Sequence, residues 1–158
     1  MPCKHSCASM ALQLFAGGLV TGVAISTLLL KKLKDETSSS SEPKRAPGIK
    51  AWRMSKWIKH DGILRTQGLC GDFSKPSSTE QQTKEALEKL DNILKECGLE
   101  RKNLLSVTIF LKDIEKDFDE MNKVYDAWVD PKGLPTRLCV QAWMGPNVQV
   151  EIRAEAYY

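Results

Sequence analysis

The pattern of apolar and polar residues changes several times along residues 53–158 of this 158-residue chain. Two β-rich runs, near 53–60 and 63–69, flank Asp61-Gly62, a dipeptide typical of a tight hairpin turn. Residues 103–113 alternate and are rich in β-branched side chains, which predicts a third strand. The last strands are predicted at 136–143 and 148–157, joined by a short turn as a second hairpin.

Two other segments repeat their apolar residues at helical spacing. The first starts at Ser78 or Thr79, either of which can cap a helix, and stops at Gly98. The second, "EKDFDEMNKVYDAWVD", ends before Pro131 and Gly133. Its apolar stripe is predicted to be core: Phe118, Met121, Val124, Tyr125 and Trp128.

The resulting element order, β-β-α-β-α-β-β, predicts an α+β fold in which two helices cover one face of a mixed sheet. The opposite faces of the strands still carry apolar residues in various combinations: Phe110, Leu138, Val140, Val150 and Ile152. About 105 residues make a small core, so we expect the second sheet face to be buried by oligomerisation.

Residues 10–30 contain no charge. A helix of this length spans roughly 30 Å, which predicts an uncleaved membrane anchor. The alternative, a secretory signal peptide, needs a small-residue cleavage site that "LLLKKLK" does not offer. The lysines that follow the span predict a cytosol-facing C-terminal domain, and such a flank also resembles anchors of the mitochondrial outer membrane.

The chain is accordingly divided into a tip (1–9), a transmembrane anchor (10–30), a basic flank with a flexible Ser/Pro-rich tether (31–50), and a folded domain (51–158). Gly18 and Gly22 form a GxxxG that either packs helices or reflects the frequency of glycine in membrane helices. Cys3 and Cys7 flank a histidine and suggest a weak metal site, palmitoylation or no specific role.

Composition narrows the function only slightly. The net charge is +3, with acids placed between the bases, so no basic stripe favours nucleic-acid binding. The five cysteines suggest no disulfide framework, and Cys70, Cys97 and Cys139 are predicted to be small buried hydrophobes. Because neither CxxC nor HExxH occurs, no strong metal site is predicted.

Arg137 and Glu151 are full charges within the last two predicted strands. In a hairpin that pairs Ala142 with Val148, both lie on one face, about 5–8 Å apart. Spacing alone leaves two interpretations open. One is an exposed salt bridge, worth about 0–1 kcal/mol. The other is an anion pocket in which the arginine binds a carboxylate and the glutamate holds a water molecule as general base.

Four stretches together resemble the RidA/YjgF/UK114 family of reactive-intermediate (enamine/imine) deaminases over essentially all of residues 53–158. They are "RMSKWIKHDGILRTQG", "LLSVTIFLKDIEKDFDEMN", "EMNKVYDAW" and "PTRLCVQAWMGPNVQVEIRAEA". The resemblance implies a chorismate-mutase-like fold, a homotrimer with pockets between subunits, and cofactor-free hydrolysis of 2-imino acids or their enamine tautomers to 2-keto acids and ammonia.

Carried over by the same resemblance, Arg137 binds the substrate carboxylate, Cys139 contributes mainly its backbone, and Glu151 positions the attacking water. The expected function is a membrane-tethered deaminase. The alternative is a non-catalytic trimeric sensor or scaffold for small carboxylates, and the small net charge argues against a ribonuclease role. The sequence departs from the family in two places: it lacks the tyrosine of a G-P-Y motif, which Trp52 or Trp57 could replace, and it has Leu69 where glutamine is usual.

Overall fold

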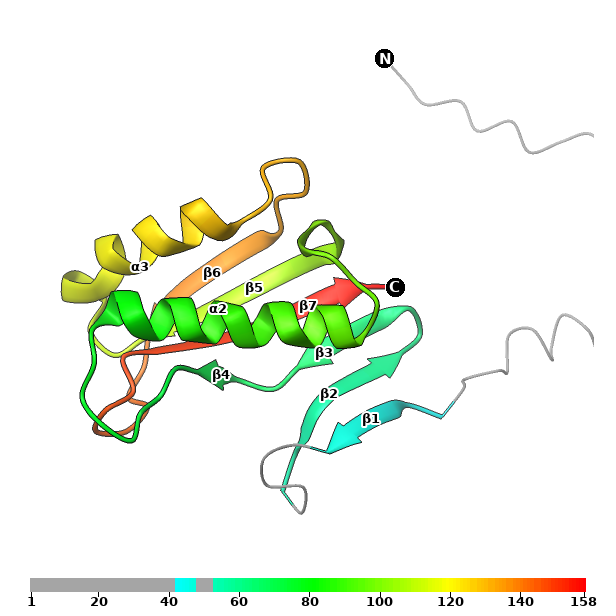
Figure 1. Cartoon of the computed structure of the whole chain (residues 1–158), viewed down its shortest axis with the longest axis horizontal. Helices are drawn as coiled ribbons and strands as arrows, with labels where there is room; N and C mark the ends of the chain where they lie inside the picture. The colour runs from blue at the N-terminus through cyan, green and yellow to red at the C-terminus, as the bar shows by residue number, and fades with distance from the viewer. Residues whose placement is uncertain (1–41, 48–52) are drawn as a thin grey trace, which may run out of the picture. The chain divides into compact units, whose positions relative to one another are not determined.

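A computed structural model describes residues 42–47 and 53–158, which form one seven-stranded sheet with helices on one face (Figure 1). All of these residues belong to one compact unit, Ser41–Tyr158. The strands are β1 (Lys44–Pro47), β2 (Ser55–His60), β3 (Ile63–Thr66), β4 (Leu69–Cys70), β5 (Leu104–Leu111), β6 (Thr136–Gln141) and β7 (Val150–Tyr157). The helices are α2 (Thr79–Glu96), the short 3₁₀ helix η1 (Arg101–Asn103) and α3 (Ile114–Trp128).

The strand order across the sheet is β1-β2-β3-β7-β5-β6, and β4 extends the β3 side by pairing with β7. β5 and β6 are parallel, as expected of a β-α-β unit in which α3 is the crossover, and the other pairs are antiparallel. The predicted α+β fold with a mixed sheet and two helices is therefore confirmed.

The predicted hairpin of the last two strands is wrong. β6 pairs with β5 on one side, β7 pairs with β5 on the other, and residues 142–149 carry the chain across the end of β5. The physical reason is the β5-α3-β6 crossover, which places β6 beside β5 before β7 arrives. β6 and β7 are therefore consecutive in the sequence but are not neighbours in the sheet.

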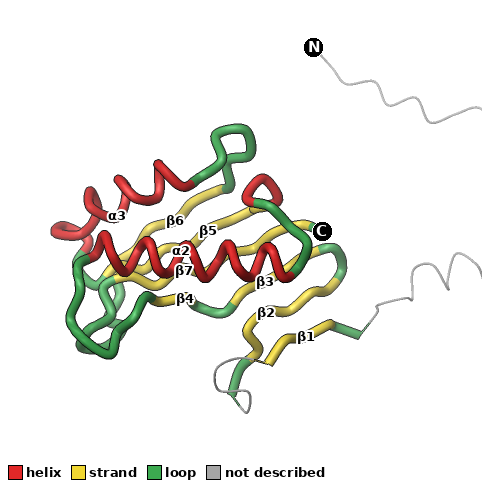
Figure 2. Tube along the Cα trace, in the orientation of Figure 1, coloured by secondary structure: helices red, strands yellow, loops and turns green. Residues whose placement is uncertain are grey.

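The sheet's inner face is the one that packs against α2 and α3 (Figure 2). Strand alternation directs Val107, Ile109, Leu111, Val150 and Ile152 to this face, and each is at most 1% exposed. From the helices, the buried apolar residues are Ala86, Leu87, Leu90, Ile93, Leu94, Met121, Tyr125 and Trp128. Phe118 is the exception to the predicted apolar stripe, because it is 37% exposed and lies outside the core.

Capping and turn residues determine where the helices and strands begin and end. Ser78 is the N-cap of α2, and its side chain accepts a hydrogen bond from the Gln81 backbone N–H at 3.1 Å. Asp61 and Gly62 both have positive φ, 48° and 76°, as a tight two-residue hairpin turn requires. The strand β1 falls within residues 31–50, where a polar tether was expected, and it pairs with β2.

The predicted membrane localisation is corrected. Within residues 42–47 and 53–158, no helix is both long and apolar enough to cross a membrane. The longest helix there, α2, has 18 residues and carries charges along its solvent side. The expected anchor at 10–30 lies outside the described residues, together with Gly18, Gly22, Cys3 and Cys7. Nothing in residues 42–47 and 53–158 supports a single-pass membrane protein or a mitochondrial location.

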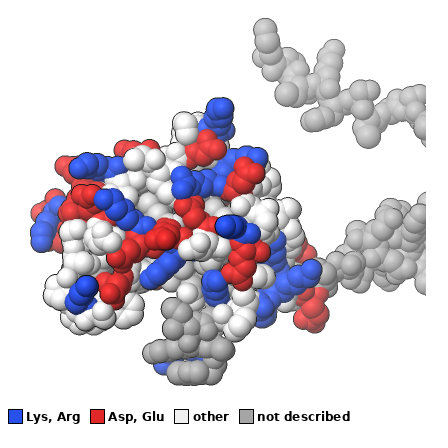
Figure 3. Space-filling view, in the orientation of Figure 1, with Lys and Arg blue, Asp and Glu red and all other residues white. Residues whose placement is uncertain are grey.

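The outer face of the sheet is the face opposite the helices. It carries a mixture of apolar and charged residues, including Leu138, which is 57% exposed, and Arg153. Within the part of the chain that the structure describes, no helix covers this face (Figure 1). On the helix side, by contrast, acidic and basic side chains are interspersed across the surface (Figure 3).

Candidate active site

Arg137 lies on the inner face of β6, where this edge strand meets α3. Its Nη1 donates a hydrogen bond of 2.6 Å to Oδ1 of Asn122, and its guanidinium lies 5.0 Å from the ring centre of Tyr125. Phe118 adds a second, more distant ring at 6.0 Å. Phe118, Asn122 and Tyr125 all come from α3, at helical spacings of four and three residues, so they share one side of the helix.

These contacts orient the guanidinium of Arg137 but leave several of its N–H groups without a hydrogen-bond acceptor. Aromatic rings hold the guanidinium by cation–π attraction while its edge stays open to other partners. Arg137 is exposed, and in the described structure only Nη1 donates a hydrogen bond. The remaining N–H groups are free to bind a planar carboxylate through two parallel hydrogen bonds.

Cys139 follows Arg137 on the same face and is packed against the core. Burial raises the pKa of its thiol, and the nearby Arg137 opposes that shift only partly. The thiol is therefore protonated at neutral pH and is a poor nucleophile. Any contribution to a ligand site at this position comes from the backbone or from packing.

Glu151 lies on the outer face of β7, in the same cross-strand row as Cys70 of β4 and Phe110 of β5. Its Oε2 is 3.8 Å from the Sγ of Cys70, which donates a weak S–H hydrogen bond. The side chain lies directly over Gly68, where an added Cβ would come within 1.8 Å of Oε1. Position 68 therefore has to be glycine for Glu151 to adopt this conformation.

Arg137 and Glu151 consequently lie on opposite faces of the sheet, and the predicted cross-strand pair is wrong. Arg137 is in register with Val107 of β5, whose side chain is buried on the inner face. Glu151 is in register with Phe110, three residues further along the same strand and therefore on the outer face. One chain alone does not bring these two side chains to one small molecule.

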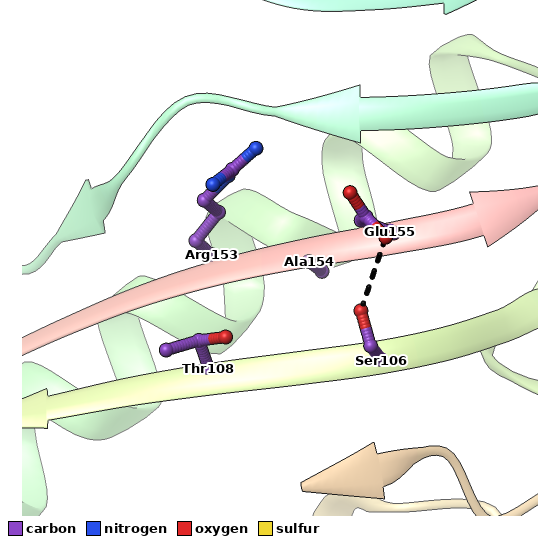
Figure 4. A pocket seen from close by; sticks show the side chains of 5 residues that line it. All are labelled: Ser106, Thr108, Arg153, Ala154 and Glu155. Atoms are coloured by element: carbon purple, nitrogen blue, oxygen red, sulfur yellow. Dashed lines mark hydrogen bonds between the residues drawn. The ribbon is translucent and has the colours of Figure 1, made fainter. Parts of the chain in front are cut away.

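Two surface hollows in the described part of the chain are lined by neither Arg137 nor Glu151. The first, of about 180 Å³, is on the outer face between β5 and β7 and is lined by Ser106, Thr108, Arg153, Ala154 and Glu155 (Figure 4). In it, Ser106 Oγ donates to Glu155 Oε2 at 3.5 Å, while the other Glu155 oxygen is paired with Arg65 at 3.0 Å.

The second hollow, of about 290 Å³, is a groove between α2 and α3. Its polar lining is already engaged: Arg101 binds Asp91 through two hydrogen bonds of 2.9 and 2.7 Å, and Trp128 Nε1 donates to the same carboxylate at 3.0 Å. These contacts tie η1 to both helices, so the groove is best explained as a structural junction.

Sequence reasoning proposed Arg137, Cys139 and Glu151 as site residues, and these roles stay predictions. It did not predict that Asn122 and Phe118 contact Arg137, although both lie in stretches that resembled the family. It also gave no role to Gly68 or Cys70. Two tryptophans could replace the missing tyrosine. The Trp57 indole donates a hydrogen bond to Glu96 at 3.1 Å, and Trp52 lies outside the described residues.

Comparison with known proteins gives consistent matches. A family model described as Endoribonuclease L-PSP matches residues 49–158. RutC family protein YoaB of Escherichia coli (strain K12) is 42% identical over 105 residues, which cover 66% of this chain and 90% of that protein. A RutC family protein of Haemophilus influenzae is 33% identical over 101 residues, covering 63% and 86%. The crystal structure of NMB1025 from Neisseria meningitidis, a member of the YjgF protein family, matches with a TM-score of 0.67 at 30% identity, covering 73% and 94%.

Proposed function

Because the chain belongs to the RidA/YjgF/L-PSP family, we propose that it hydrolyses 2-imino acids, or their enamine tautomers, to 2-keto acids and ammonia. The observation that carries the proposal is the placement of Arg137. Its guanidinium is held by Tyr125 and Asn122 and keeps N–H donors free, as the carboxylate of a small 2-imino acid requires.

We infer further that each site is built from two copies of the chain in a homotrimer. Arg137 and Glu151 face opposite sides of their own sheet, so a site that uses both takes Arg137 from one copy and Glu151 from the next. The outer face supports this assembly, because it presents apolar side chains such as Leu138 and no helix of the described chain covers it. A head-to-tail ring of subunits repeats the same site at each interface.

In this site Arg137 fixes the substrate carboxylate and thereby sets the position of the imine carbon. Glu151 accepts a proton from a water molecule while the water oxygen attacks that carbon. Glu151 returns this proton to nitrogen, which gives the tetrahedral carbinolamine. The second water proton then moves from the hydroxyl group to nitrogen as the C–N bond breaks, so ammonia leaves and the oxygen remains as the new keto group. The overall balance is one imino acid and one water giving one keto acid and one ammonia.

The test couples an amino-acid oxidase to the purified protein and follows semicarbazone formation from the imine. We expect wild-type protein to lower the semicarbazone signal, and Arg137→Ala to lower kcat/KM by about 30- to 1,000-fold, since a charged hydrogen-bonded partner is worth about 2–4 kcal/mol. Lys132→Ala, on the exposed loop before β6, serves as the control and should behave as wild type.

Calorimetry with a 2-keto acid separates this proposal from its alternative. Binding that depends on Arg137, without turnover of any imino acid tried, would identify a non-catalytic carboxylate sensor or scaffold. The alternative is motivated by the absence of the family tyrosine from this sequence. Neither binding nor turnover would contradict both functions.

A further inference from the structure

The carboxylate of Glu151 has an unusual support. In the described structure, its one hydrogen-bond donor is the thiol of Cys70, which contacts Oε2 at 3.8 Å. The other oxygen, Oε1, lies over Gly68 and accepts no hydrogen bond there. The two oxygens of one carboxylate are thus in different environments.

Cys70 is itself held in place from two sides. On the sheet, the two-residue strand β4 pairs Leu69 with Ile152 and Cys70 with Glu151. From α2, the Nζ of Lys89 donates to the carbonyl of Cys70 at 2.6 Å and to that of Gly71 at 3.4 Å. The thiol therefore sits on a backbone that is fixed relative to Glu151.

We propose that Cys70 is a positioning residue: its S–H fixes Oε2 of Glu151 so that Oε1 is presented to the water or substrate. This inference rests on the proposed function. The cysteine concerned is Cys70, beside Glu151, and not Cys139, which was expected at the site. The role requires no redox or covalent step at sulfur.

The protonation state of Cys70 agrees with a donor role. Burial, the negative charge of Glu151 and the hydrogen bond to it together raise the pKa of this thiol to about 11, and Lys89 opposes the shift only weakly. At neutral pH the group is S–H, which can donate, and not a thiolate, which would repel the carboxylate.

Kinetics of two substitutions test the role in turnover. Cys70→Ala removes the donor and should lower kcat by about three- to tenfold, the effect of one weak hydrogen bond to a charged group. KM should stay unchanged because the carboxylate of the substrate is bound by Arg137 of the neighbouring copy, which Cys70 does not contact. Cys70→Ser keeps a donor and should recover most of kcat. Wild-type kcat in Cys70→Ala, or an equal loss in both variants, would overturn the proposal.

A second measurement does not require turnover. Alkylation of Cys70 by iodoacetamide at pH 9, followed by mass spectrometry of its peptide, should be slow in the wild type because the thiol is mostly protonated. Glu151→Gln removes the charge that helps to raise the pKa of Cys70, so the rate should rise several-fold. Cys139, whose pKa is raised by burial next to Arg137, is the internal control and should not change.

The two measurements separate the ways in which the account can fail. Wild-type protein without deaminase activity contradicts the proposed function, whatever Cys70 does. An unchanged alkylation rate of Cys70 in Glu151→Gln contradicts the thiol–carboxylate contact, whatever the activity. Active wild-type protein with a faster rate in Glu151→Gln, and a kcat defect in Cys70→Ala that serine repairs, supports the positioning role.

Discussion

At the scale of single residues, the candidate site shows what the alternation of side chains along a strand can and cannot predict. Residue type alone marked Arg137 and Glu151 as unusual in strands, and the family resemblance assigned their roles. Their relative placement was wrong, because it assumed direct pairing of β6 with β7. With β5 between them, the register places Arg137 beside buried Val107 and Glu151 beside Phe110, on opposite faces.

Gly68 gives a sharp prediction at this scale. In Gly68→Ala the new Cβ would meet Glu151 Oε1 at 1.8 Å and Cδ at 2.6 Å, so the carboxylate must leave its position. We expect kcat to fall by about 100-fold or more, since a positioned general base contributes roughly 100- to 10,000-fold. Binding of a 2-keto acid, measured by calorimetry, should persist because it depends on Arg137. Wild-type kcat in Gly68→Ala would show that the observed position of Glu151 is not the working one.

At the scale of elements, the helices and most strands followed from periodicity and capping residues, because these signals are local. Two strands did not. β1 is short and lies in a polar, proline-containing segment, and β4 has only two residues, so neither shows a period. The strand with which β6 pairs is determined by the tertiary fold and not by local sequence. The strand–helix–strand order could nevertheless have indicated that β6 lies parallel to β5.

Gln82 connects α2 to the β6–β7 connection and supplies a prediction about stability. Its side chain is fully buried; Nε2 donates to the Asn147 carbonyl at 2.7 Å, and Oε1 accepts from the Gln149 N–H at 2.8 Å. Gln82→Leu leaves both backbone groups unpaired and should lower the free energy of unfolding by about 2–4 kcal/mol.

Urea denaturation provides the measurement, and the neighbouring glutamine provides a matched control. Gln81 is exposed and bonds only Glu85 through its side chain, one turn along the same helix. Gln81→Leu should therefore change the unfolding free energy by no more than about 0.5 kcal/mol. Equal effects of the two substitutions would mean that the buried network does not stabilise the fold.

At the scale of the whole molecule, the uncovered outer face and the divided site point to the same assembly. Leu138→Glu places a charge at an apolar position of the outer face that is 57% exposed in the single chain. If this face is an interface between copies, the charge must be desolvated there, and light scattering should show the molar mass falling toward that of one chain. Asn92→Glu, on the exposed side of α2, should leave the molar mass unchanged.

The central claim is that Arg137 of one copy and Glu151 of another form one active site. Co-expression of Arg137→Ala and Glu151→Gln subunits, each strongly impaired alone, tests it most directly. In random head-to-tail trimers, an interface is intact when one subunit keeps Arg137 and the next keeps Glu151, a chance of one half for each, so about a quarter of the wild-type sites should recover. Deaminase activity near this fraction is the predicted result. Mixed trimers with no activity above that of either parent would place both residues in a site within one chain and contradict the account.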